Sequence, residues 1–332
     1  MKQYHLAFDV NGNDNGVKAA VKAAIYFLQK NKNFKITLVG DEQEIKKYLP
    51  EEQISQIMIL NNPNTVKSDE NIKAAIKVDS SMKSAITMVK NKEADAVLSS
   101  GDSASYLALC NFVLKRLDNV SRPAFMPIFP TIKGKKFLLL DVGANLEVKK
   151  EFLKEWALIS NEYAKIILNI DQPKIALVNI GTEEYKGNEV TKEANLEFKE
   201  LPNINYIGFV EPRDLLRYIC DVAIIDGYGG NILLKSIEGA ILSFKDIIKE
   251  KISAKLIRKI GYLFIKGAFR DVSETLDYRN VGSAYVIGVN GLAMKAHGSS
   301  DYLSFLGALN QIKLALEKDI MTKVNEASNE IN

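Results

Sequence analysis

The sequence is poor in residues that cross-link a chain or bind metal, with two cysteines and two histidines among 332 residues. Cys110 and Cys220 lie far apart among apolar neighbours, which favours two buried thiols over a disulfide or a catalytic thiol. His5 and His297 have no partners at the spacing of a zinc site. These absences argue against a disulfide-stabilised or zinc-dependent protein.

Long apolar runs are absent as well, and no stretch approaches the roughly 20 apolar residues of a membrane-spanning helix. The first residues lack the apolar stretch of a signal peptide. An excess of one charge is also absent, because 44 Lys and Arg stand against 41 Asp and Glu, a formal net charge of +3. This balance does not point to nucleic acid. We therefore expect a cytoplasmic protein that binds no nucleic acid.

What the sequence does contain is a regular alternation of short apolar runs with helical patterns. The apolar runs lie at 6–8, 36–39, 96–98, 137–140, 175–178 and 222–225. The helical patterns lie at 17–29, 81–90, 103–117, 148–168, 231–251 and 302–317. This alternation predicts an α/β fold with a doubly wound, mainly parallel sheet. Since no repeat or linker divides the chain, we expect one α/β domain over 1–325 and a frayed tail over 326–332.

Several apolar runs end in turns rich in glycine, asparagine and aspartate, at the strand ends where open α/β sheets bind ligands. The turn at 9–16 precedes an apolar helix, so its amide groups could hold an anion at the helix start. A tight turn that simply caps the helix explains the same residues. The candidate binding residues in this turn are Asp9, Gly12, Asp14 and Asn15.

A second turn carries a cation. Lys186, followed by Gly187 and Asn188, comes after the apolar run at 175–178. Its ammonium group could approach a phosphate or a developing oxyanion, because Gly187 adds no side chain beside it. An exposed loop lysine with no such role is the alternative.

A third turn, with Asp226 and Gly227, leads into a helix that begins near Asn231. A side-chain amide and free backbone amides at a helix start can converge on an anion. The alternative role of Asn231 is that of an N-cap.

The turn at 297–301 combines His297 with two serines and an aspartate. A serine hydrolase is not supported, because the sequence contains no Gly-x-Ser-x-Gly elbow. A turn in which Ser or Asp caps the last long helix is an equally good explanation. We keep His297 as a candidate proton donor.

The segment at about 240–277 is predicted to form a basic amphipathic helical hairpin, broken near Gly261 or Gly267. Between residues 245 and 270, eight basic minus two acidic residues leave a charge of +6. One interpretation is a dimer-forming hairpin with a solvated basic face. The other is peripheral attachment to an anionic membrane, with Leu263 and Phe264 as the contact residues, and the two interpretations are compatible.

Taken in order, these segments resemble the bacterial phosphate acyltransferases that use acyl carrier protein, the PlsX family. The resemblance spans nearly the whole chain and adds Ser99, Gly101 and Asn145 to the candidate binding residues. The sequence departs from the usual family loops around Asn13 and at Asp102 and Ser103. The matching residues lie at 9–15, 79–82, 99–101, 122–123, 140–145, 179–181, 186–188, 210–214, 226–227, 231, 235 and 296–300.

The resemblance implies a three-layer fold similar to isocitrate and isopropylmalate dehydrogenases, a homodimer, and no bound cofactor. It also implies that a fatty acyl group moves from acyl carrier protein to inorganic phosphate, and that a membrane acyltransferase consumes the acyl phosphate in phospholipid synthesis. Phosphate is the nucleophile, so the protein positions reactants and stabilises charge, with Lys186 at the phosphate and Asn231 at the oxyanion. The alternatives are a phosphotransacetylase-like enzyme using acyl coenzyme A and a non-catalytic scaffold derived from the family.

Overall fold

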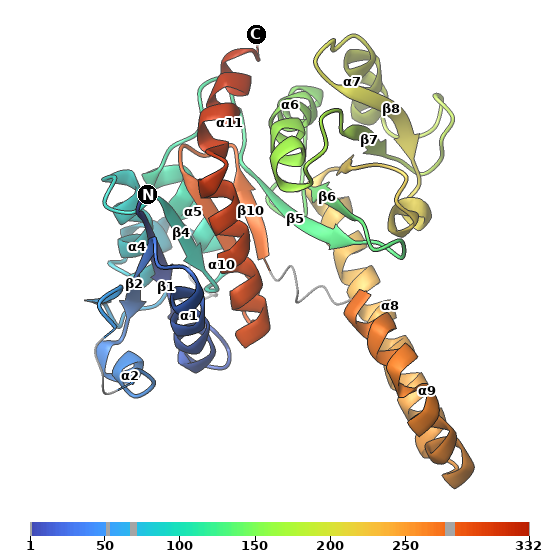
Figure 1. The fold of residues 1–332 in the computed structure, drawn as a ribbon. Helices are drawn as coiled ribbons and strands as arrows, with labels where there is room; N and C mark the ends of the chain where they lie inside the picture. The colour runs from blue at the N-terminus through green and yellow to red at the C-terminus, as the bar shows by residue number, and fades with distance from the viewer. Residues whose placement is uncertain (1, 51–53, 67–71, 276–282, 332) are drawn as a thin grey trace.

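The computed structural model describes residues 2–50, 54–66, 72–275 and 283–331. Residues 276 and 277 of the predicted hairpin, Met1 of the predicted domain and Asn332 of the predicted tail lie outside these ranges. Within them the strands form one sheet in the order β3-β2-β1-β4-β11-β10-β5-β6-β9-β7-β8. Figure 1 shows the sheet passing between helices through two halves of the molecule.

The first half contains parallel strands with helices on both faces (Figure 1). Strand β1 pairs with β2 and β4, and β4 pairs with β11, all in parallel. The strands are β1 (Tyr4–Asp9), β2 (Phe34–Gly40), β3 (Ile57–Asn61), β4 (Ala96–Ser99) and β11 (Leu292–Ala296). The helices are α1 (Lys18–Lys30), α2 (Glu42–Lys46), α3 (Ile72–Lys77), α4 (Ser81–Lys90), α5 (Ser103–Val113), α10 (Tyr302–Glu317) and α11 (Ile320–Asn329).

The second half is a smaller parallel arrangement in which β9 lies between β6 and β7, and β8 forms the edge. Helices α6 and α7 pack against each other beside it (Figure 1). Its elements are β6 (Lys136–Leu140), α6 (Lys150–Ile167), β7 (Lys174–Val178), α7 (Glu189–Lys199), β8 (Asn205–Val210), a 3-10 helix (Pro212–Arg217) and β9 (Val222–Ile224).

Strand β5 (Ala124–Pro130) joins the two halves. Residues 124–127 pair antiparallel with β10 (Ser283–Ile287), and residues 128–130 pair antiparallel with β6. The sequence pattern did not predict β5, because Pro127 and Pro130 within it are atypical of an interior strand.

Burial on both faces of the parallel strands explains their continuous apolar runs. Along β1, Leu6 and Phe8 belong to one hydrophobic cluster and the intervening Ala7 belongs to the cluster on the other face. The three layers are therefore helices, sheet and helices. The predicted bounds of α4 and α10 coincide with those of the structure, and the predicted α5 ends four residues too late.

A helical hairpin projects from the second half and is formed by α8 (Gly227–Ser253) and α9 (Leu256–Thr275) (Figure 1). The predicted break near Gly261 or Gly267 is wrong, because both glycines lie inside α9 and the chain turns at residues 254–255. The turn needs no glycine, since Ala254 stays in the right-handed region and Arg258 donates to the Lys251 carbonyl oxygen. In the described part of the chain, no helix is long and apolar enough to cross a membrane.

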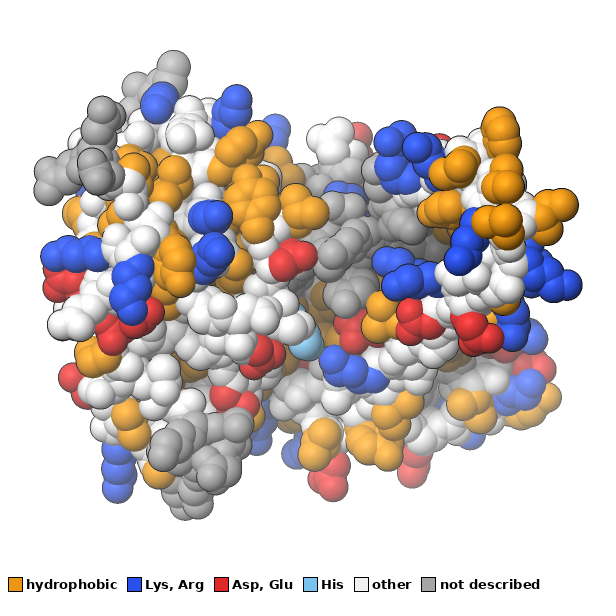
Figure 2. Space-filling view, turned by 90° about the horizontal axis from the view of Figure 1, so that it is seen from below, with side chains coloured by type: hydrophobic (Ala, Val, Ile, Leu, Met, Phe, Trp, Pro, Cys, Tyr) orange, Lys and Arg blue, Asp and Glu red, His pale blue; other side chains and the backbone are white. Residues whose placement is uncertain are grey.

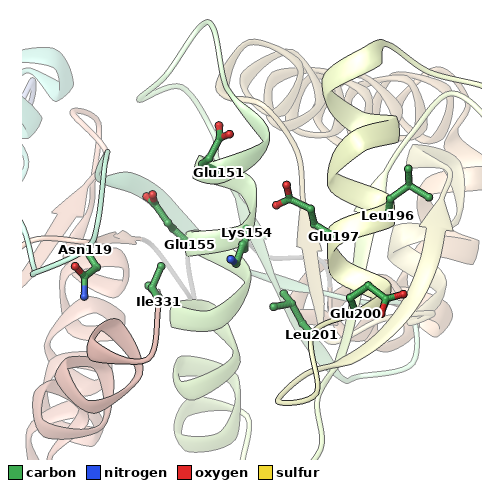
Figure 3. Close-up of a pocket in the computed structure, with 9 residues that line it drawn as sticks. All are labelled: Asn119, Glu151, Lys154, Glu155, Leu196, Glu197, Glu200, Leu201 and Ile331. Atoms are coloured by element: carbon green, nitrogen blue, oxygen red, sulfur yellow. The ribbon is translucent and has the colours of Figure 1, made fainter.

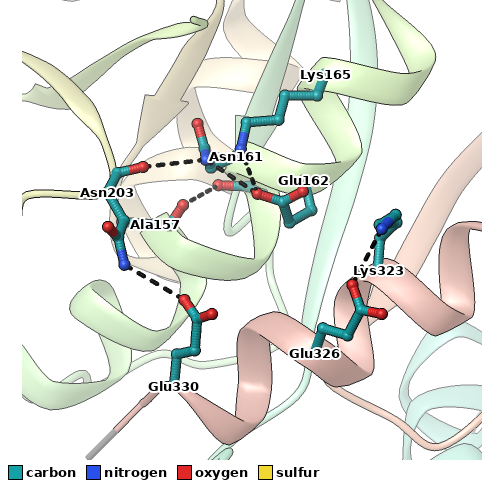
Figure 4. A network of polar contacts seen from close by, with 9 residues as sticks. Ala157, Asn161, Glu162, Lys165, Asn203, Lys323, Glu326 and Glu330 are labelled. Carbon is teal, nitrogen blue, oxygen red and sulfur yellow. Dashed lines mark hydrogen bonds and ion pairs between the residues drawn. The ribbon is translucent and has the colours of Figure 1, made fainter. Parts of the chain in front are cut away.

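The predicted fraying of the tail is wrong for the residues that the structure describes. Helix α11 continues to Asn329, and Ser328 is buried. Figure 4 shows Asn203 Nδ2 donating to Glu330 Oε2 over 3.3 Å, while the Asn203 carbonyl oxygen accepts from Asn161 of α6. The prediction failed because most residues of this segment are polar, although α11 is amphipathic. Its Ile320 and Val324 pack into the core.

Candidate active site

The predicted site residues fall into two groups at strand ends, one in each half. The parallel strands β1, β4 and β11 carry Asp9, Gly12, Asp14, Asn15, Ser99, Gly101 and His297. The parallel strands β6, β9 and β7 carry Asn145, Lys186, Gly187, Asn188, Asp226, Gly227 and Asn231. Because β5 and β10 lie between the two sets of strands, a site built from both groups spans the junction of the halves.

A hydrogen bond to Asp9 links the ends of β1 and β4. The Ser99 hydroxyl donates to Asp9 Oδ2 over 2.6 Å, and the Gly101 amide donates to Ser99 Oγ over 3.1 Å. Burial raises the pKa of Asp9 to about 6, against the opposing effect of the Ser99 hydrogen bond. Gly12 has a φ of +73° and lies so close to Gly101 that a Cβ would stand 2.9 Å from its Cα. The cluster holds two loops in contact.

The rest of the first loop supports the turn that carries His297. The Asp14 amide donates to the Gly298 carbonyl oxygen over 2.9 Å, and Asn15 Nδ2 donates to the Ser299 carbonyl oxygen over 3.4 Å. Asn13 Nδ2 donates to the Ser300 carbonyl oxygen over 3.2 Å. Asp14 and Asn15 therefore position a turn of the site, and their direct contact with phosphate stays a prediction.

Asn145 and Gly227 belong to a buried network around Asp141. The Asn145 amide donates to Asp141 Oδ2 over 2.7 Å, and its side chain donates to the Pro123 carbonyl oxygen over 2.8 Å. The Gly227 amide donates to the Asn145 carbonyl oxygen over 2.9 Å, and a Cβ on Gly227 would come within 2.4 Å of that oxygen. This close approach requires glycine at the start of α8.

Asp226, and not Asn231, is the N-cap of α8, because its carboxylate accepts from the Gly229 amide over 2.7 Å. Asn231 is thus free for another role. Its side chain packs beside Gly143, whose φ is +122° and whose Cβ would stand 3.4 Å from Asn231 Cγ. Gly143 leaves room for the amide group at this place.

Lys186 lies at the rim of the second half and does not line the pocket described below. Its ammonium forms an ion pair with Glu183 at 2.8 Å, with about a third of the lysine side chain exposed. The side chain folds over Gly181, where a Cβ would stand 2.4 Å from Lys186 Cδ. Gly187 makes room for Asn179, and Asn188 caps α7 by accepting from the Thr191 amide over 2.8 Å. The phosphate contacts predicted for Gly187 and Asn188 remain untested.

A pocket of about 380 Å³ lies between the halves and unites residues of both groups. Asn231, Lys235 and Glu238 of α8 line it from the second half. Seen from below, Figure 2 shows the molecule hollowed between its halves, with a histidine in the hollow. The remaining lining residues include apolar side chains of β5 and a polar set from the first half: Phe125, Ile128, Phe129, Ser103, Lys295, His297, Ser299, Ser300, Asp301 and Ser304.

The electrostatics of the pocket keep His297 neutral. Burial lowers the pKa of His297, and the neighbouring Lys235 lowers it further, while Glu238 opposes them. Nδ1 lies 2.7 Å from the Ser299 hydroxyl oxygen and accepts from the Ser299 amide over 3.2 Å. Because Nδ1 accepts, the neutral ring carries its proton on Nε2 and can donate a hydrogen bond there.

Sequence reasoning assigned no role to several polar residues of the pocket, among them Ser103, Lys295, Ser300 and Glu238, and it did not notice Lys295 at all. Lys295 is the clearest case, because it lies on a buried strand with only 7% of its surface exposed. The signal that could have found it is a lysine inside the apolar run 292–296, where a charge is costly to bury. Lys235 was noted on the helix of Asn231 without a role.

Another hollow, of about 700 Å³, lies away from these residues between α6, α7 and the end of α11 (Figure 3). Glu151, Glu155, Glu197 and Glu200 line it together with Lys154. Glu155 is engaged in holding the Ser121 amide and hydroxyl at 2.7 and 2.6 Å. Four carboxylates make this hollow unsuitable for a phosphate. The central pocket is the candidate active site because it brings together Asn231 and His297, which were predicted from the sequence.

Comparison with known proteins identifies the family. The family described as "Fatty acid synthesis protein" matches residues 4–323. A phosphate acyltransferase from Mycoplasmopsis agalactiae is 57% identical over 329 residues, which cover 98% of each chain. The chain belongs to the phosphate acyltransferase family. A second phosphate acyltransferase, from Mycoplasma mobile, is 53% identical over 97% of this chain and 98% of its own. The predicted membership of this family is confirmed.

The fold prediction is confirmed as well. A branched-chain phosphotransacylase from Enterococcus faecalis matches with a TM-score of 0.59 at 15% identity, covering 94% of this phosphate acyltransferase and 98% of the other chain. An isocitrate dehydrogenase from Methylococcus capsulatus matches with a TM-score of 0.50 at 10% identity, covering 96% of this chain and 88% of its own. At such identities the likeness concerns the fold alone.

Proposed function

We propose that this phosphate acyltransferase moves a fatty acyl group from the thioester of acyl carrier protein to inorganic phosphate and releases acyl phosphate for phospholipid synthesis. One observation carries the proposal: the central pocket combines hydrogen-bond donors and cations with an apolar wall. Asn231 and Lys235 come from one half and His297 from the other, while Phe125 and Phe129 of β5 form apolar lining. Such a pocket suits an anion beside an acyl chain.

The reaction needs no nucleophile from the protein. A phosphate oxygen attacks the thioester carbonyl carbon, a carbon–oxygen bond forms, and the carbonyl oxygen becomes an oxyanion. The carbon–sulfur bond then breaks, and the thiolate leaves with the bonding electrons and takes a proton from solvent. In our proposal the Asn231 amide and the Nε2–H of neutral His297 donate to the oxyanion. A histidine that accepts at Nδ1 suits this role better than the proton donation suggested by the sequence.

Lys186 remains in the proposal as a cation on the loop that follows β7. The loop that carries it follows β7, and the parallel neighbour β9 leads into α8 and Asn231. Its partner Glu183 is exposed, and an exposed ion pair is weak because solvent screens it, so an incoming phosphate can replace the carboxylate.

The hairpin supports two further parts of the proposal, a homodimer and peripheral contact with an anionic membrane. Apolar side chains of α8 are exposed along its length, among them Phe244 at 63% and Ile247 at 54%. In α9, Leu263 is 62% and Phe264 is 86% exposed. From below, hydrophobic and basic side chains mix over the projecting end of the molecule (Figure 2). We assign the α8 face to a second copy and the Leu263–Phe264 region to lipid.

This arrangement fits a cytoplasmic enzyme that works at the membrane surface, where a membrane acyltransferase consumes the acyl phosphate. No cofactor enters the proposed reaction. A phosphotransacetylase-like enzyme that uses acyl coenzyme A is the alternative, because it too needs a phosphate pocket and a thioester. A non-catalytic scaffold is the third possibility.

The deciding experiment measures release of free carrier-protein thiol from palmitoyl acyl carrier protein, with and without inorganic phosphate. We expect thiol release and acyl phosphate only when phosphate is present, without added nucleotide or metal. Equal release without phosphate would indicate a thioesterase. Preference for palmitoyl coenzyme A would favour the phosphotransacetylase-like enzyme, and no release from either donor would favour the scaffold.

A further inference from the structure

Lys295 is a buried cation in the wall of the central pocket. It is the fourth residue of β11, its residue exposure is 7%, and it lines the pocket. Among the described residues, the Ala296 carbonyl oxygen is the one acceptor within hydrogen-bond distance of its ammonium group, and no carboxylate lies within 4.0 Å. A lysine ammonium has three donors. Two of them are thus left for a ligand or water.

Ser300 places an unpartnered hydroxyl in the same pocket. The residue is 3% exposed, and its Oγ has no hydrogen-bond partner in the described structure. A buried hydroxyl without a partner lowers the stability of the folded chain, because it has lost its hydrogen bonds to water. Proteins rarely retain such a group unless a ligand or an ordered water molecule forms a hydrogen bond with it. The backbone holds Ser300 in place, because its amide donates to the His297 carbonyl oxygen over 3.0 Å.

The first turn of α5 adds backbone donors beside the pocket. Asp102 caps the helix by accepting from the Ser105 amide over 2.8 Å, which leaves the amides of Ser103 and Ala104 outside the cap. Ser103 also lines the pocket. The N-terminus of α5, where the helix dipole is positive, therefore borders the pocket that Lys295 and Ser300 also line.

One of the two lysines that line the pocket has no close carboxylate partner. Lys235 is paired with Glu238 at 3.2 Å, and Asp301 is engaged as the N-cap of α10, so Lys295 is the cation left without a close carboxylate. Asp9, Asp14 and Asp102 act on it from a distance and favour its charged form, whereas burial lowers the pKa of Lys295 to about 8. A bound phosphate would supply the missing counter-charge.

We propose that Lys295 and Ser300 form the phosphate-binding subsite of this enzyme, with the bound phosphate facing the first turn of α5. The proposal rests on the function proposed above and names the residues that hold the nucleophile. Asn231 and Lys235 then lie on the other wall, where the thioester carbonyl is received. A phosphate could come from solution or from the phosphodiester of the carrier's pantetheine arm, and we assign the subsite to inorganic phosphate.

The test compares Lys295→Met and Ser300→Ala in the full-length chain by steady-state thiol release with palmitoyl acyl carrier protein. Losing one hydrogen bond to a charged group should raise the KM for phosphate by about 10- to 100-fold in each variant. The KM for the acyl carrier protein should change by less than about 2-fold. Lys313→Met is the matched control, because Lys313 is also partly buried and its ammonium donates to Asn31 Oδ1 away from the pocket.

Titration with inorganic phosphate followed by ³¹P NMR gives a second readout that does not need turnover. We expect wild-type protein to bind phosphate and both variants to bind it at least about 10-fold more weakly. If Lys295→Met does not fold, Ser300→Ala alone decides the matter, since it removes one oxygen. An unchanged KM for phosphate in folded Ser300→Ala would overturn the subsite, as would a rise confined to the KM for acyl carrier protein.

Failure of the proposed function has a different signature. If wild-type protein released no thiol in response to phosphate but lost phosphate binding on both substitutions, the subsite would stand and the reaction would be wrong. If thiol release required phosphate and neither substitution affected phosphate binding or its KM, the reaction would stand and the subsite would be wrong.

Discussion

The Nδ1 atom of His297 accepts a hydrogen bond from the Ser299 amide over 3.2 Å and lies 2.7 Å from the Ser299 hydroxyl oxygen. A backbone amide can only donate, so this nitrogen carries the lone pair and Nε2 carries the proton. The other histidine has the reverse arrangement. Nδ1 of His5 lies 2.5 Å from the Glu93 carbonyl oxygen, which can only accept, so His5 carries its proton on Nδ1.

The first prediction is that the two histidines are neutral and in opposite tautomers at about pH 7, because the pKa of each is lowered from 6.5 chiefly by burial. Long-range ¹H–¹⁵N NMR spectra distinguish the tautomers, and His5→Gln assigns the two sets of signals. Ser299→Ala should move the pKa of His297 upward, since the hydroxyl stabilises the neutral ring. A proton on Nδ1 of His297 would remove this residue as an oxyanion donor.

The second prediction concerns Asn231 and Lys186. Replacing either by Ala should lower turnover by about 10²-fold or more, the usual effect of losing one preorganised donor to an oxyanion. The free energy of unfolding should change by no more than about 1 kcal/mol, because neither residue caps a helix or lies in the core. Glu183→Gln is the control for Lys186, since it releases the ammonium from its ion pair and should leave turnover intact. Near-normal turnover in Lys186→Ala would confine the reaction to the central pocket.

The third prediction concerns the buried carboxylate of Asp9. Its pKa is about 6 in the folded protein against 3.8 as the ordinary value, so the folded state binds the proton more tightly. The resulting stability is complete below 3.8 and is lost as the pH rises through about 6. Asp9→Asn should therefore raise the free energy of unfolding at about pH 8 by up to about 3 kcal/mol, and the gain should vanish below about pH 4.

Urea unfolding at a series of pH values measures this effect, with the exposed Asp246→Asn as a control that should show no such dependence. A destabilised Asp9→Asn protein at high pH would mean that the Ser99 and Asn11 hydrogen bonds outweigh the cost of burying the charge. In either case the comparison measures how much stability is given up to keep a carboxylate at this strand end.

The fourth prediction concerns the hairpin. The protein should sediment with vesicles that contain anionic lipid and not with neutral ones, because each basic residue near the surface contributes about 1 kcal/mol. High salt and the double substitution Leu263→Glu, Phe264→Glu should both weaken binding, while turnover in solution survives. Phe112→Glu is the control, since Phe112 is 60% exposed on α5, outside the hairpin. If lipid charge and the double substitution both had no effect, only the dimer role would remain for this segment.

The sequence allowed the parallel strands and their helices to be predicted, because buried parallel strands are continuous apolar runs. It did not allow β5 to be predicted, since Pro127 and Pro130 argue against an interior strand and only its position between β10 and β6 explains them. The hairpin was recognised from its charge and periodicity. Its turn was misplaced because glycine was expected to mark the break.

Within the candidate site, Asn231 and His297 could be predicted because each follows a strand in a polar turn. Lys295 and Ser300 could not, because their importance depends on which partners they lack in the folded chain, and this is a property of three-dimensional packing. Asp226 and Asn188 are N-caps in the structure, a role that the sequence analysis had considered for Asn231 and not for these two residues.

The division of β5 between two partners has a mechanical consequence. Since residues 124–127 are bonded to β10 and residues 128–130 to β6, a small change of twist within this strand would rotate the two halves against each other. The two walls of the pocket would then move toward or away from each other, because α8 forms one wall and the His297 turn belongs to the opposite wall. We expect an acyl chain too large for the resting volume to be admitted by flexing of β5, while the packing inside each half stays as it is.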